Sequence, residues 1–326
     1  MVQLTVRHEA WPVRGKFTIS RGSRTQADVV VAELSDGTHV GRGECLPYPR
    51  YGESVEGVIA EIEALGGPLA EGLDRRGLQS RLPAGAARNA VDLAFWDLEC
   101  KRAGKRHWDL AGLPQPGPVT TAFTLSIDTP EEMGRKAAAN AERPILKLKL
   151  AGPDDLDRVE AVRANAPKAR IVVDANEGWT AAQYSALVPD LQRLGVVMVE
   201  QPLPAGDDAA LAGIERPVPV CADESCHDTA TLAALKGRYD MVNIKLDKTG
   251  GLTEALRLKQ AAEAEGYGIM VGCMLTTSLA CAPAVVLAQG VALTDIDAPL
   301  LLAEDRDPPL KIEGSLVYPP APALWG

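Results

Sequence analysis

The feature that most constrains the fold is a repeated alternation of short apolar runs with amphipathic stretches, which begins near residue 120. The amphipathic stretches have helical spacing and capping residues, as in TPEEMGRKAAANAE. Strands that alternate with helices pair in parallel, and eight such units predict an α/β fold, a (β/α)8-type barrel. An open, doubly wound sheet is the rival topology, but its Gly-rich phosphate turn is missing from the sequence. The eight runs are TTAFTLSI, ILKLKL, RIVVDAN, VVMVEQP, VPVCADE, DMVNIKL, GIMVGCM and VALTDIDAP.

Residues 1–115 have a different pattern, which predicts a separate α+β domain. VQLTVRHEA, KFTIS, ADVVVAELSDG and HVGRGEC are typical of successive antiparallel strands, with SDG as a turn. The stretch RNAVDLAFWDLECKRAG then predicts a helix with one apolar face. We expect a modified TIM barrel over residues 116–302 and a proline-rich tail over residues 303–326 that packs back onto the first domain.

Composition and charge narrow the classes of partner. The chain has 326 residues, of which 24% are charged, and a formal net charge of −10. This acidic balance argues against a nucleic-acid partner, which requires a basic face. The first residues lack a basic segment followed by an apolar one, and no stretch approaches about 18 uninterrupted apolar residues. We therefore expect no membrane partner and a cytoplasmic location.

Cysteine and histidine provide little material for disulfides or zinc. The six cysteines are scattered and form no CxxC pair, which is typical of reduced and mostly packed thiols. The four histidines form no HxxxH pair. Any metal ion is therefore expected to be held by carboxylates, which favours Mg²⁺.

The apolar run ILKLKL contains two lysines, Lys147 and Lys149, on one face of its predicted strand. Because a buried ammonium group without a partner is costly, these lysines need counter-charges. The next three strands end in Asp174, Glu200 and Asp223, and the carboxyl ends of barrel strands meet at one rim. Three converging carboxylates repel one another unless a cation lies between them, which predicts a Mg²⁺ site. The alternative is that each acid caps the helix that follows it.

Lys245 leaves the sixth strand on the other side of the three acids from Lys147 and Lys149. An acid and a base on opposite faces of one carbon can remove a proton from one side and return it from the other, which inverts the centre. The alternative is that the lysines only neutralise the acids. We also expect the metal and the neighbouring lysines to lower the pKa of such a lysine toward the range of a base.

These residues are similar to those of the enolase superfamily, in its muconate-lactonizing subgroup, which is known to use a Lys or His base with Mg²⁺. The chain resembles most closely the dipeptide epimerases that act on L-Ala-D/L-Glu, over nearly its whole length. The resemblance implies that residues 1–115 cap the barrel mouth, that Asp174, Glu200 and Asp223 bind one Mg²⁺ per subunit, and that Lys149 and Lys245 are the acid and base. Lys147 would hold the substrate carboxylate. The segments that carry the resemblance include GECLPYPRYGES, PAGAARNA, KLKL, VDANEGW, CADESCH, VNIKLDKTGG and TDIDAP.

The same resemblance implies a substrate site for a dipeptide. Asp295 and Asp297 of TDIDAP would receive the ammonium group of the first residue, although two acids before a proline are also typical of a turn. By this resemblance, Arg21 and Arg24 of ISRGSR would lie in a loop over the barrel mouth, and a guanidinium group of either one suits the side-chain carboxylate of glutamate. The residues expected to line the rest of the site are Thr124, Cys273 and Leu275.

Three alternatives stay open in the sequence. An o-succinylbenzoate synthase or cycloisomerase shares this set of acids and lysines, but its substrate carries no ammonium group for Asp295 and Asp297. A dipeptide epimerase of different specificity needs only small changes near Ile19, Leu275 or the arginine loop. A non-catalytic relative would have no use for intact lysines and acids. A homo-oligomer and a role in recycling cell-wall peptides are compatible with the resemblance.

Overall fold

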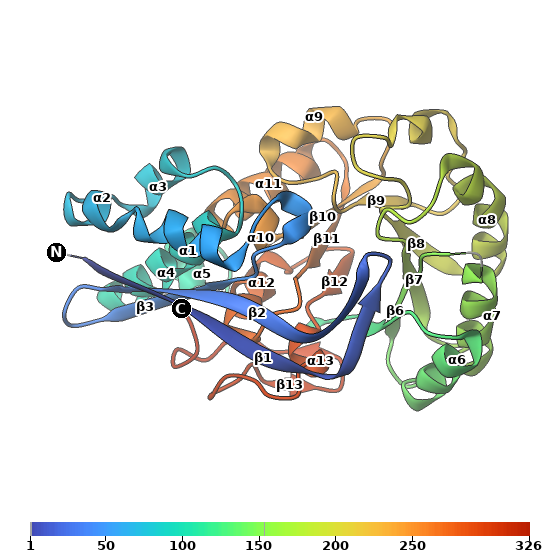
Figure 1. Ribbon diagram of the computed structural model, residues 1–326, viewed down its shortest axis with the longest axis horizontal. Coiled ribbons are helices and arrows are strands. Elements are labelled where there is room, and N and C mark those ends of the chain that lie inside the picture. Colours follow the sequence, from blue (N-terminus) through green and yellow to red (C-terminus); the bar gives the residue numbers. More distant parts are fainter. Residues whose placement is uncertain (1, 153) are drawn as a thin grey trace.

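The computed structural model describes residues 2–152 and 154–326, which form a barrel of parallel strands and an adjoining region of antiparallel sheet and helices (Figure 1). The eight barrel strands are hydrogen-bonded in sequence order, and the ring closes where Ala122 N donates to Thr294 O at 2.8 Å. The prediction of a barrel with these eight strands is confirmed. The strands are β5 Phe123–Leu125, β6 Ile145–Lys149, β7 Arg170–Asp174, β8 Val196–Glu200, β9 Val220–Ala222, β10 Met241–Lys245, β11 Gly268–Gly272 and β12 Leu293–Asp295.

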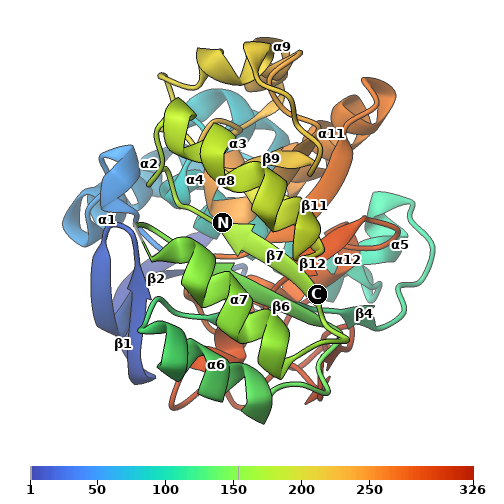
Figure 2. The same ribbon diagram turned by 90° about the vertical axis from the view of Figure 1, so that its right-hand side faces the viewer.

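Helices cover the outside of the barrel, and Figure 2 shows three of them, α6, α7 and α8, lying over strands β6 and β7. Two connections are shorter than the βα rhythm predicts, because only 3₁₀ turns and the one-turn helix α9 join β8 to β9 and β9 to β10. The helices and turns of this part are α6 Pro130–Ala139, α7 Asp155–Asn165, α8 Ala181–Arg193, η2 Ala209–Gly213, η3 Thr229–Thr231, α9 Leu232–Leu235, α10 Leu246–Thr249, α11 Leu252–Ala264, α12 Ser278–Leu287 and α13 Ala298–Leu301.

The barrel interior follows from the two-residue alternation of each strand. In β6 the leucines Leu146 and Leu148 pack into the large core between the barrel and its helices, while Ile145 faces the barrel axis. At the end of the barrel opposite the mouth, each strand or the residue just before it contributes one apolar side chain to a plug. Polar side chains face inward only nearer the mouth. The plug consists of Ala122, Ile145, Val172, Met198, Cys221, Met241, Met270 and Leu293.

The N-terminal region is a three-stranded antiparallel sheet with helices on one side. The segments VQLTVRHEA and KFTIS, expected as two strands, are parts of one long strand, β1 (Gln3–Ile19), because its pairing with β2 continues across a register shift between Pro12 and Phe17. The predicted SDG turn joins β2 to β3. The elements are β2 Gly22–Ser35, β3 Val40–Cys45, η1 Pro49–Tyr51, α1 Val55–Glu63, α2 Gly66–Ala70, α3 Arg75–Arg81, α4 Ala86–Ala103 and α5 His107–Ala111.

The hairpin of β1 and β2 is the part of this region that reaches the barrel mouth (Figure 1). Its two-residue turn, Ser20 and Arg21, lies beside the loop that follows β7, where Ser20 Oγ donates to Asn176 O at 2.7 Å. Its last part also contacts the loop after β5, where Ile127 N donates to Thr18 O at 3.1 Å. The hairpin therefore covers the ends of the strands that carry the predicted acids and lysines.

The C-terminal tail contacts both parts of the molecule. Strands β13 (Ile312–Glu313) and β14 (Leu316–Val317) form a small sheet with β4 (Val119–Thr120). Further along, Trp325 Nε1 donates to Leu93 O of α4 at 3.2 Å. The division into residues 1–115, 116–302 and 303–326 stays a prediction. Among the described residues, none of the helices has both the length and the apolar character needed to cross a membrane.

Helix α4 lies directly against β3, and two glycines make this close approach possible. A Cβ on Gly43 would lie 2.0 Å from Ala90 O, and one on Gly41 would lie 2.1 Å from Ala94 O. Both contacts are with the helix backbone, so relief would require the helix and the strand to move apart. Packed interiors resist such movement.

We predict that Gly43→Ala destabilises the protein by about 3 kcal/mol or more, because overpacking against backbone atoms exceeds the usual cost of an added methylene. Gly67→Ala is the matched control, since a Cβ there meets nothing within 4 Å and the residue lies in helix α2. The measurement is the midpoint of denaturant unfolding. Equal midpoints for the two variants would contradict the packing argument.

Candidate active site

The barrel mouth contains a dense cluster of buried lysines and carboxylates. Lys147, 1% exposed at its side chain, lies with its Nζ 2.6 Å from Glu200 Oε2, 2.7 Å from Asp295 Oδ2 and 3.2 Å from Asp174 Oδ2. Lys149 Nζ lies 2.6 Å from Asp174 Oδ2. Strand register sets this arrangement, because Lys149 pairs directly with Asp174, and Asp174 pairs directly with Glu200. The counter-charges expected for the two lysines of ILKLKL are therefore present.

A second group of charges surrounds Asp223 on the far side of Glu200. Lys245 Nζ lies 2.6 Å from Asp223 Oδ2, and Lys248 Nζ lies 2.6 Å from Asp223 Oδ1. Lys149 and Lys245 thus contact the two outer carboxylates of the predicted triplet, Asp174 and Asp223. This matches the expected placement of the lysines on opposite sides of the acids.

Burial and charge shift several pKa values in this cluster. Burial, followed by the charge of Asp174, raises the pKa of Glu200 to about 7. Burial alone would lower the pKa of Lys147, but Asp295, Glu200 and Asp174 together raise it. The pKa of Lys245 is also raised, because the charges of Asp223 and Glu200 have a larger effect than burial, which alone would lower it. In this arrangement, without a metal ion, the contacts with carboxylates therefore raise the pKa of Lys147 and Lys245. The lowering of a lysine pKa by a bound metal ion stays a prediction.

The predicted metal ligands offer suitable donor atoms. Asp174, Glu200 and Asp223 are fully buried, project from adjacent strands and present hard carboxylate oxygens. Glu200 Oε2 accepts no hydrogen bond of good geometry, although Lys147 Nζ lies nearby. Lysine ammonium groups lie between these carboxylates. Within residues 2–152 and 154–326, no three Asp, Glu, His or Cys side chains are therefore arranged as a ready metal site. The three carboxylates supply the hard oxygen donors that Mg²⁺ prefers.

Two cavities meet above these charges. The larger, about 220 Å³, lies under the β1–β2 hairpin, and the smaller, about 40 Å³, lies toward β12 and β5. Lys149 and Lys245 line both cavities, so they stand at the junction between them. Cys273 and Leu275 also line both cavities, as expected for residues of the substrate site.

The smaller cavity contains the two acids of the TDIDAP segment and Thr124. Asp297 Oδ2 accepts a hydrogen bond from Thr124 N at 2.6 Å, and burial together with Asp295 raises the pKa of Asp297 to about 7. Asp295 Oδ1 has no hydrogen-bond partner among the described residues. The side chain of Asp297 does not cap helix α13, so capping does not account for this acid.

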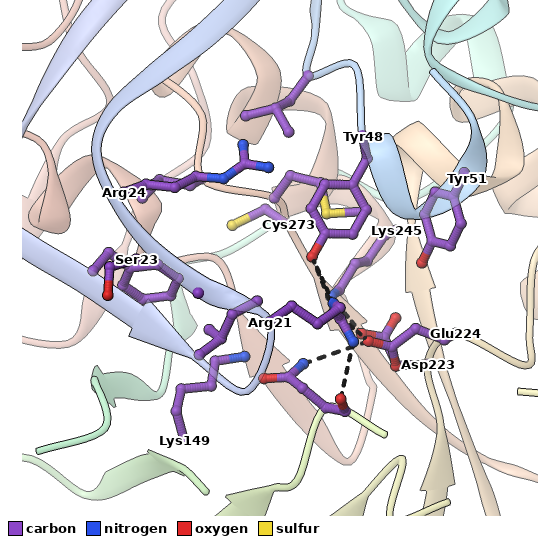
Figure 3. A pocket seen from close by; sticks show the side chains of 17 residues that line it. Arg21, Ser23, Arg24, Tyr48, Tyr51, Lys149, Asp223, Glu224, Lys245 and Cys273 are labelled. Atoms are coloured by element: carbon purple, nitrogen blue, oxygen red, sulfur yellow. Dashed lines mark hydrogen bonds and ion pairs between the residues drawn. The ribbon is translucent and has the colours of Figure 1, made fainter. Parts of the chain in front are cut away.

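The larger cavity contains both predicted arginines, which differ in their contacts (Figure 3). Arg21 donates to Glu224 Oε1 at 2.7 Å, to Asn176 O at 2.9 Å and to the Tyr48 hydroxyl at 2.9 Å. Arg24 stacks on the Tyr48 ring, with its guanidinium carbon 5.5 Å from the ring centroid. In the part of the chain that the structure describes, Arg24 forms no ion pair and no side-chain hydrogen bond.

Four residues of the site were not among the sequence predictions. Lys248 holds Asp223, Asn243 Nδ2 donates to Glu200 Oε1 at 2.7 Å, and Asn176 N donates to Asp174 Oδ1 at 2.9 Å. Glu224, which pairs with Arg21, is fully buried. Lys248 and Glu224 stand in the quoted motifs VNIKLDKTGG and CADESCH, but each lies after its strand has ended, where alternation no longer predicts direction.

Comparison with protein families gives two matches that together span most of the chain. Residues 1–112 match the mandelate racemase/muconate lactonizing enzyme N-terminal domain, and residues 132–322 match the enolase C-terminal domain-like family. Among curated proteins, the L-Ala-D/L-Glu epimerase of Escherichia coli K12 is 50% identical, covering 95% of this chain and 98% of its own. The N-acetyl-D-glutamate racemase of a Pseudoalteromonas species is 41% identical, covering 91% and 95%.

Solved structures give the same picture. An enolase family member from Agrobacterium tumefaciens with homology to dipeptide epimerases, solved with sodium, L-Ala-L-Glu and an ordered loop, is 56% identical with a TM-score of 0.98, covering all of both chains. The dipeptide epimerase of Enterococcus faecalis, in complex with Mg and L-Leu-L-Tyr, is 29% identical with a TM-score of 0.90, covering 98% of this chain and 96% of its own.

We predict that MgCl₂ raises the melting temperature and that Asp174→Asn abolishes the rise, because the variant loses one oxygen charge of the predicted site. At 100 times Kd a ligand that binds only the folded chain stabilises it by about 2.7 kcal/mol. Asp128→Asn is the control, since this acid is 40% exposed and pairs with Lys136 outside the barrel mouth. Differential scanning fluorimetry with and without EDTA measures the effect, and an undiminished rise in Asp174→Asn would contradict the ligand assignment.

Proposed function

Because the chain belongs to the mandelate racemase/muconate lactonizing enzyme family, we propose that it is a Mg²⁺-dependent isomerase, a dipeptide epimerase whose substrate is L-Ala-D/L-Glu. One observation carries this proposal beyond family membership. Lys149 and Lys245 stand where two unequal cavities meet. The smaller cavity contains acids, and the larger one contains an arginine that forms no ion pair among the described residues. A dipeptide with one ammonium end and one acidic side chain is complementary to this arrangement.

The smaller cavity supports binding of the N-terminal residue. Asp295 and Asp297 would receive its ammonium group, and a volume of about 40 Å³ suits a side chain as small as that of alanine. Asp295 Oδ1 has no hydrogen-bond partner among the described residues, so it can accept one from the ligand. The backbone of Thr124 already holds Asp297 in position.

The second residue of the dipeptide would then lie with its α-carbon between Lys149 and Lys245. One lysine removes the α-proton from one face and the other returns a proton from the opposite face, which inverts the centre. Loss of the proton places a second negative charge beside the substrate carboxylate, and Lys147 donates to that charge from below. Asp174, Glu200 and Asp223 would hold Mg²⁺, which supplies a Lewis acid for the same carboxylate.

The side chain of the second residue would extend into the larger cavity. Arg21 is already paired with Glu224 and with Asn176 O. The guanidinium group of Arg24 stacks on Tyr48 and forms no ion pair among residues 2–152 and 154–326. We therefore assign recognition of the glutamate carboxylate to Arg24. A charge-assisted, two-point contact of this kind favours glutamate over apolar residues.

The rival reactions fit the site less well. The substrates of an o-succinylbenzoate synthase or a cycloisomerase carry no ammonium group, and neither does N-acetylglutamate. With any of these ligands, Asp295 and Asp297 would face no cationic group of the ligand. A specificity for hydrophobic dipeptides would leave Arg24 without a counter-charge. We further propose that the enzyme acts in the cytoplasm on dipeptides from cell-wall turnover, because L-Ala-D-Glu is a unit of such peptides.

We predict that Arg24→Met lowers kcat/KM for L-Ala-L-Glu by about 100-fold, because a charge-assisted contact of about 2–5 kcal/mol is lost. The kcat/KM for L-Ala-L-Met should change by less than about threefold, since the Met side chain fills similar space. Polarimetry or chiral chromatography with both substrates measures the two values. An equal loss for both dipeptides would contradict the role of Arg24 in recognising the carboxylate.

We predict that L-Ala-L-Glu kept in heavy water with the enzyme and Mg²⁺ acquires deuterium at the α-carbon of its second residue with each inversion. Lys149→Ala and Lys245→Ala should each abolish epimerisation, yet each should retain exchange from one stereoisomer, and the two variants should retain opposite ones. Proton NMR of the α-position follows both processes.

Lys136→Ala, a change on the outer helix α6, should behave as the wild type in this experiment. Melting temperatures confirm that each variant is folded, which is expected because Asp174 and Asp223 each keep a second lysine partner. Substrate that stays unlabelled and keeps its configuration with the wild type would refute the proposed reaction.

A further inference from the structure

The turn of the β1–β2 hairpin and one predicted metal ligand contact the same residue, Asn176. On one side, both residues of the turn donate to Asn176 O, Ser20 Oγ at 2.7 Å and Arg21 Nη1 at 2.9 Å. On the other side, Asn176 N donates to Asp174 Oδ1 at 2.9 Å and Asn176 Nδ2 donates to Asp174 Oδ2 at 3.2 Å. A single buried residue therefore joins the hairpin to the carboxylate.

The backbone at Asn176 and Glu177 is left-handed, a conformation that asparagine adopts more readily than most residues but that is unusual for glutamate. The φ of Asn176 is 44°, and that of Glu177 is 66°, both in the left-handed region. This geometry directs the Asn176 carbonyl toward the hairpin and its N–H groups toward Asp174. Such strain persists only where surrounding contacts hold it, and two of those contacts come from the hairpin turn.

Arg21 makes further contacts with the same part of the barrel rim. Its Nη1 lies 3.1 Å from Glu177 Oε2, and its Nη2 lies 2.7 Å from Glu224 Oε1, next in sequence to Asp223. Figure 3 shows the guanidinium group of Arg21 between Tyr48 and Glu224, apart from that of Arg24. Arg21 therefore contacts the loops that follow β7 and β9. The predicted metal ligands Asp174, at the end of β7, and Asp223, just after β9, lie next to these contacts.

We propose that Arg21 is a positioning residue that couples closure of the hairpin to Mg²⁺ binding, by holding Asn176 and through it Asp174. The proposal rests on the proposed function and deepens it. When the turn is in place, Asn176 orients the carboxylate of Asp174. When the turn leaves, Asn176 loses two donors and holds Asp174 less firmly, and only the lysine contacts of that carboxylate remain. Because coupling between two sites is reciprocal, Mg²⁺ also stabilises the closed hairpin and the position of Arg24.

The test measures binding and exchange and needs no turnover. Arg21→Lys keeps the charge but cannot contact Asn176 O, Glu224 and Tyr48 at once, and Ser20→Ala removes one neutral donor. Keeping the charge matters, because loss of a cation near the acids would by itself favour Mg²⁺. Arg14→Lys is the matched control, since Arg14 is exposed in β1, the strand that leads into the turn. Isothermal titration calorimetry gives the Mg²⁺ Kd of each full-length protein.

The expected result is a rise in the Mg²⁺ Kd of about fivefold or more in Arg21→Lys, a smaller rise in Ser20→Ala, and no change in Arg14→Lys. Hydrogen exchange of residues 17–24 should slow on addition of Mg²⁺ in the wild type and in Arg14→Lys, and this slowing should be lost in Arg21→Lys. A rise below fivefold in Arg21→Lys, or a hairpin whose exchange does not respond to Mg²⁺ in the wild type, overturns the coupling.

These outcomes differ from failure of the proposed function. A wild type that does not bind Mg²⁺ refutes the metal-dependent reaction itself. A wild type that binds Mg²⁺ and epimerises the dipeptide, together with an unchanged Kd in Arg21→Lys, refutes only the role of Arg21. Melting temperatures of the variants separate a local loss of coupling from a general loss of folding.

Discussion

The arrangement of the barrel mouth depends on compensation of charges that are buried out of water. Lys147, Lys149, Lys245 and Lys248 face Asp174, Glu200, Asp223 and Asp295, four positive charges against four negative ones, with close contacts throughout. Removal of one partner from such a group leaves a buried charge whose desolvation is uncompensated. The positive and negative charges are not paired one to one. Two lysines contact Asp223, while Lys147 contacts three acids.

The two lysines proposed as acid and base are held separately. The two lysines at the junction of the cavities contact different carboxylates, so each can be positioned without the other. The apolar plug below them keeps water from entering through the lower end of the barrel, which strengthens electrostatic contacts above it. The barrel therefore supplies the charged side chains and also buries them, which strengthens the electrostatic contacts between them.

The N-terminal region adds what the barrel lacks. Its hairpin forms the roof of the larger cavity and supplies two arginines with different contacts. Arg21 is bound to the rim, and Arg24 forms no ion pair among the described residues. The two arginines are three residues apart, so movement of the turn would displace both. If the proposed roles of Arg24 and Arg21 hold, recognition of a side chain and organisation of the metal ligands are linked through one short segment.

The sequence alone determined the eight strands and the inward direction of Lys147, Lys149, Asp174 and Glu200, because a two-residue alternation and the shared rim of parallel strands are local rules. It also predicted that Asp295 and Asp297 would share a cavity. Only the tertiary structure decided which arginine is bound to the rim, because the partner of Arg21 lies 203 residues away in sequence. Lys248, Glu224 and Asn176 escaped prediction for the same physical reason: they follow strand ends, where the chain turns and its direction depends on contacts with distant segments.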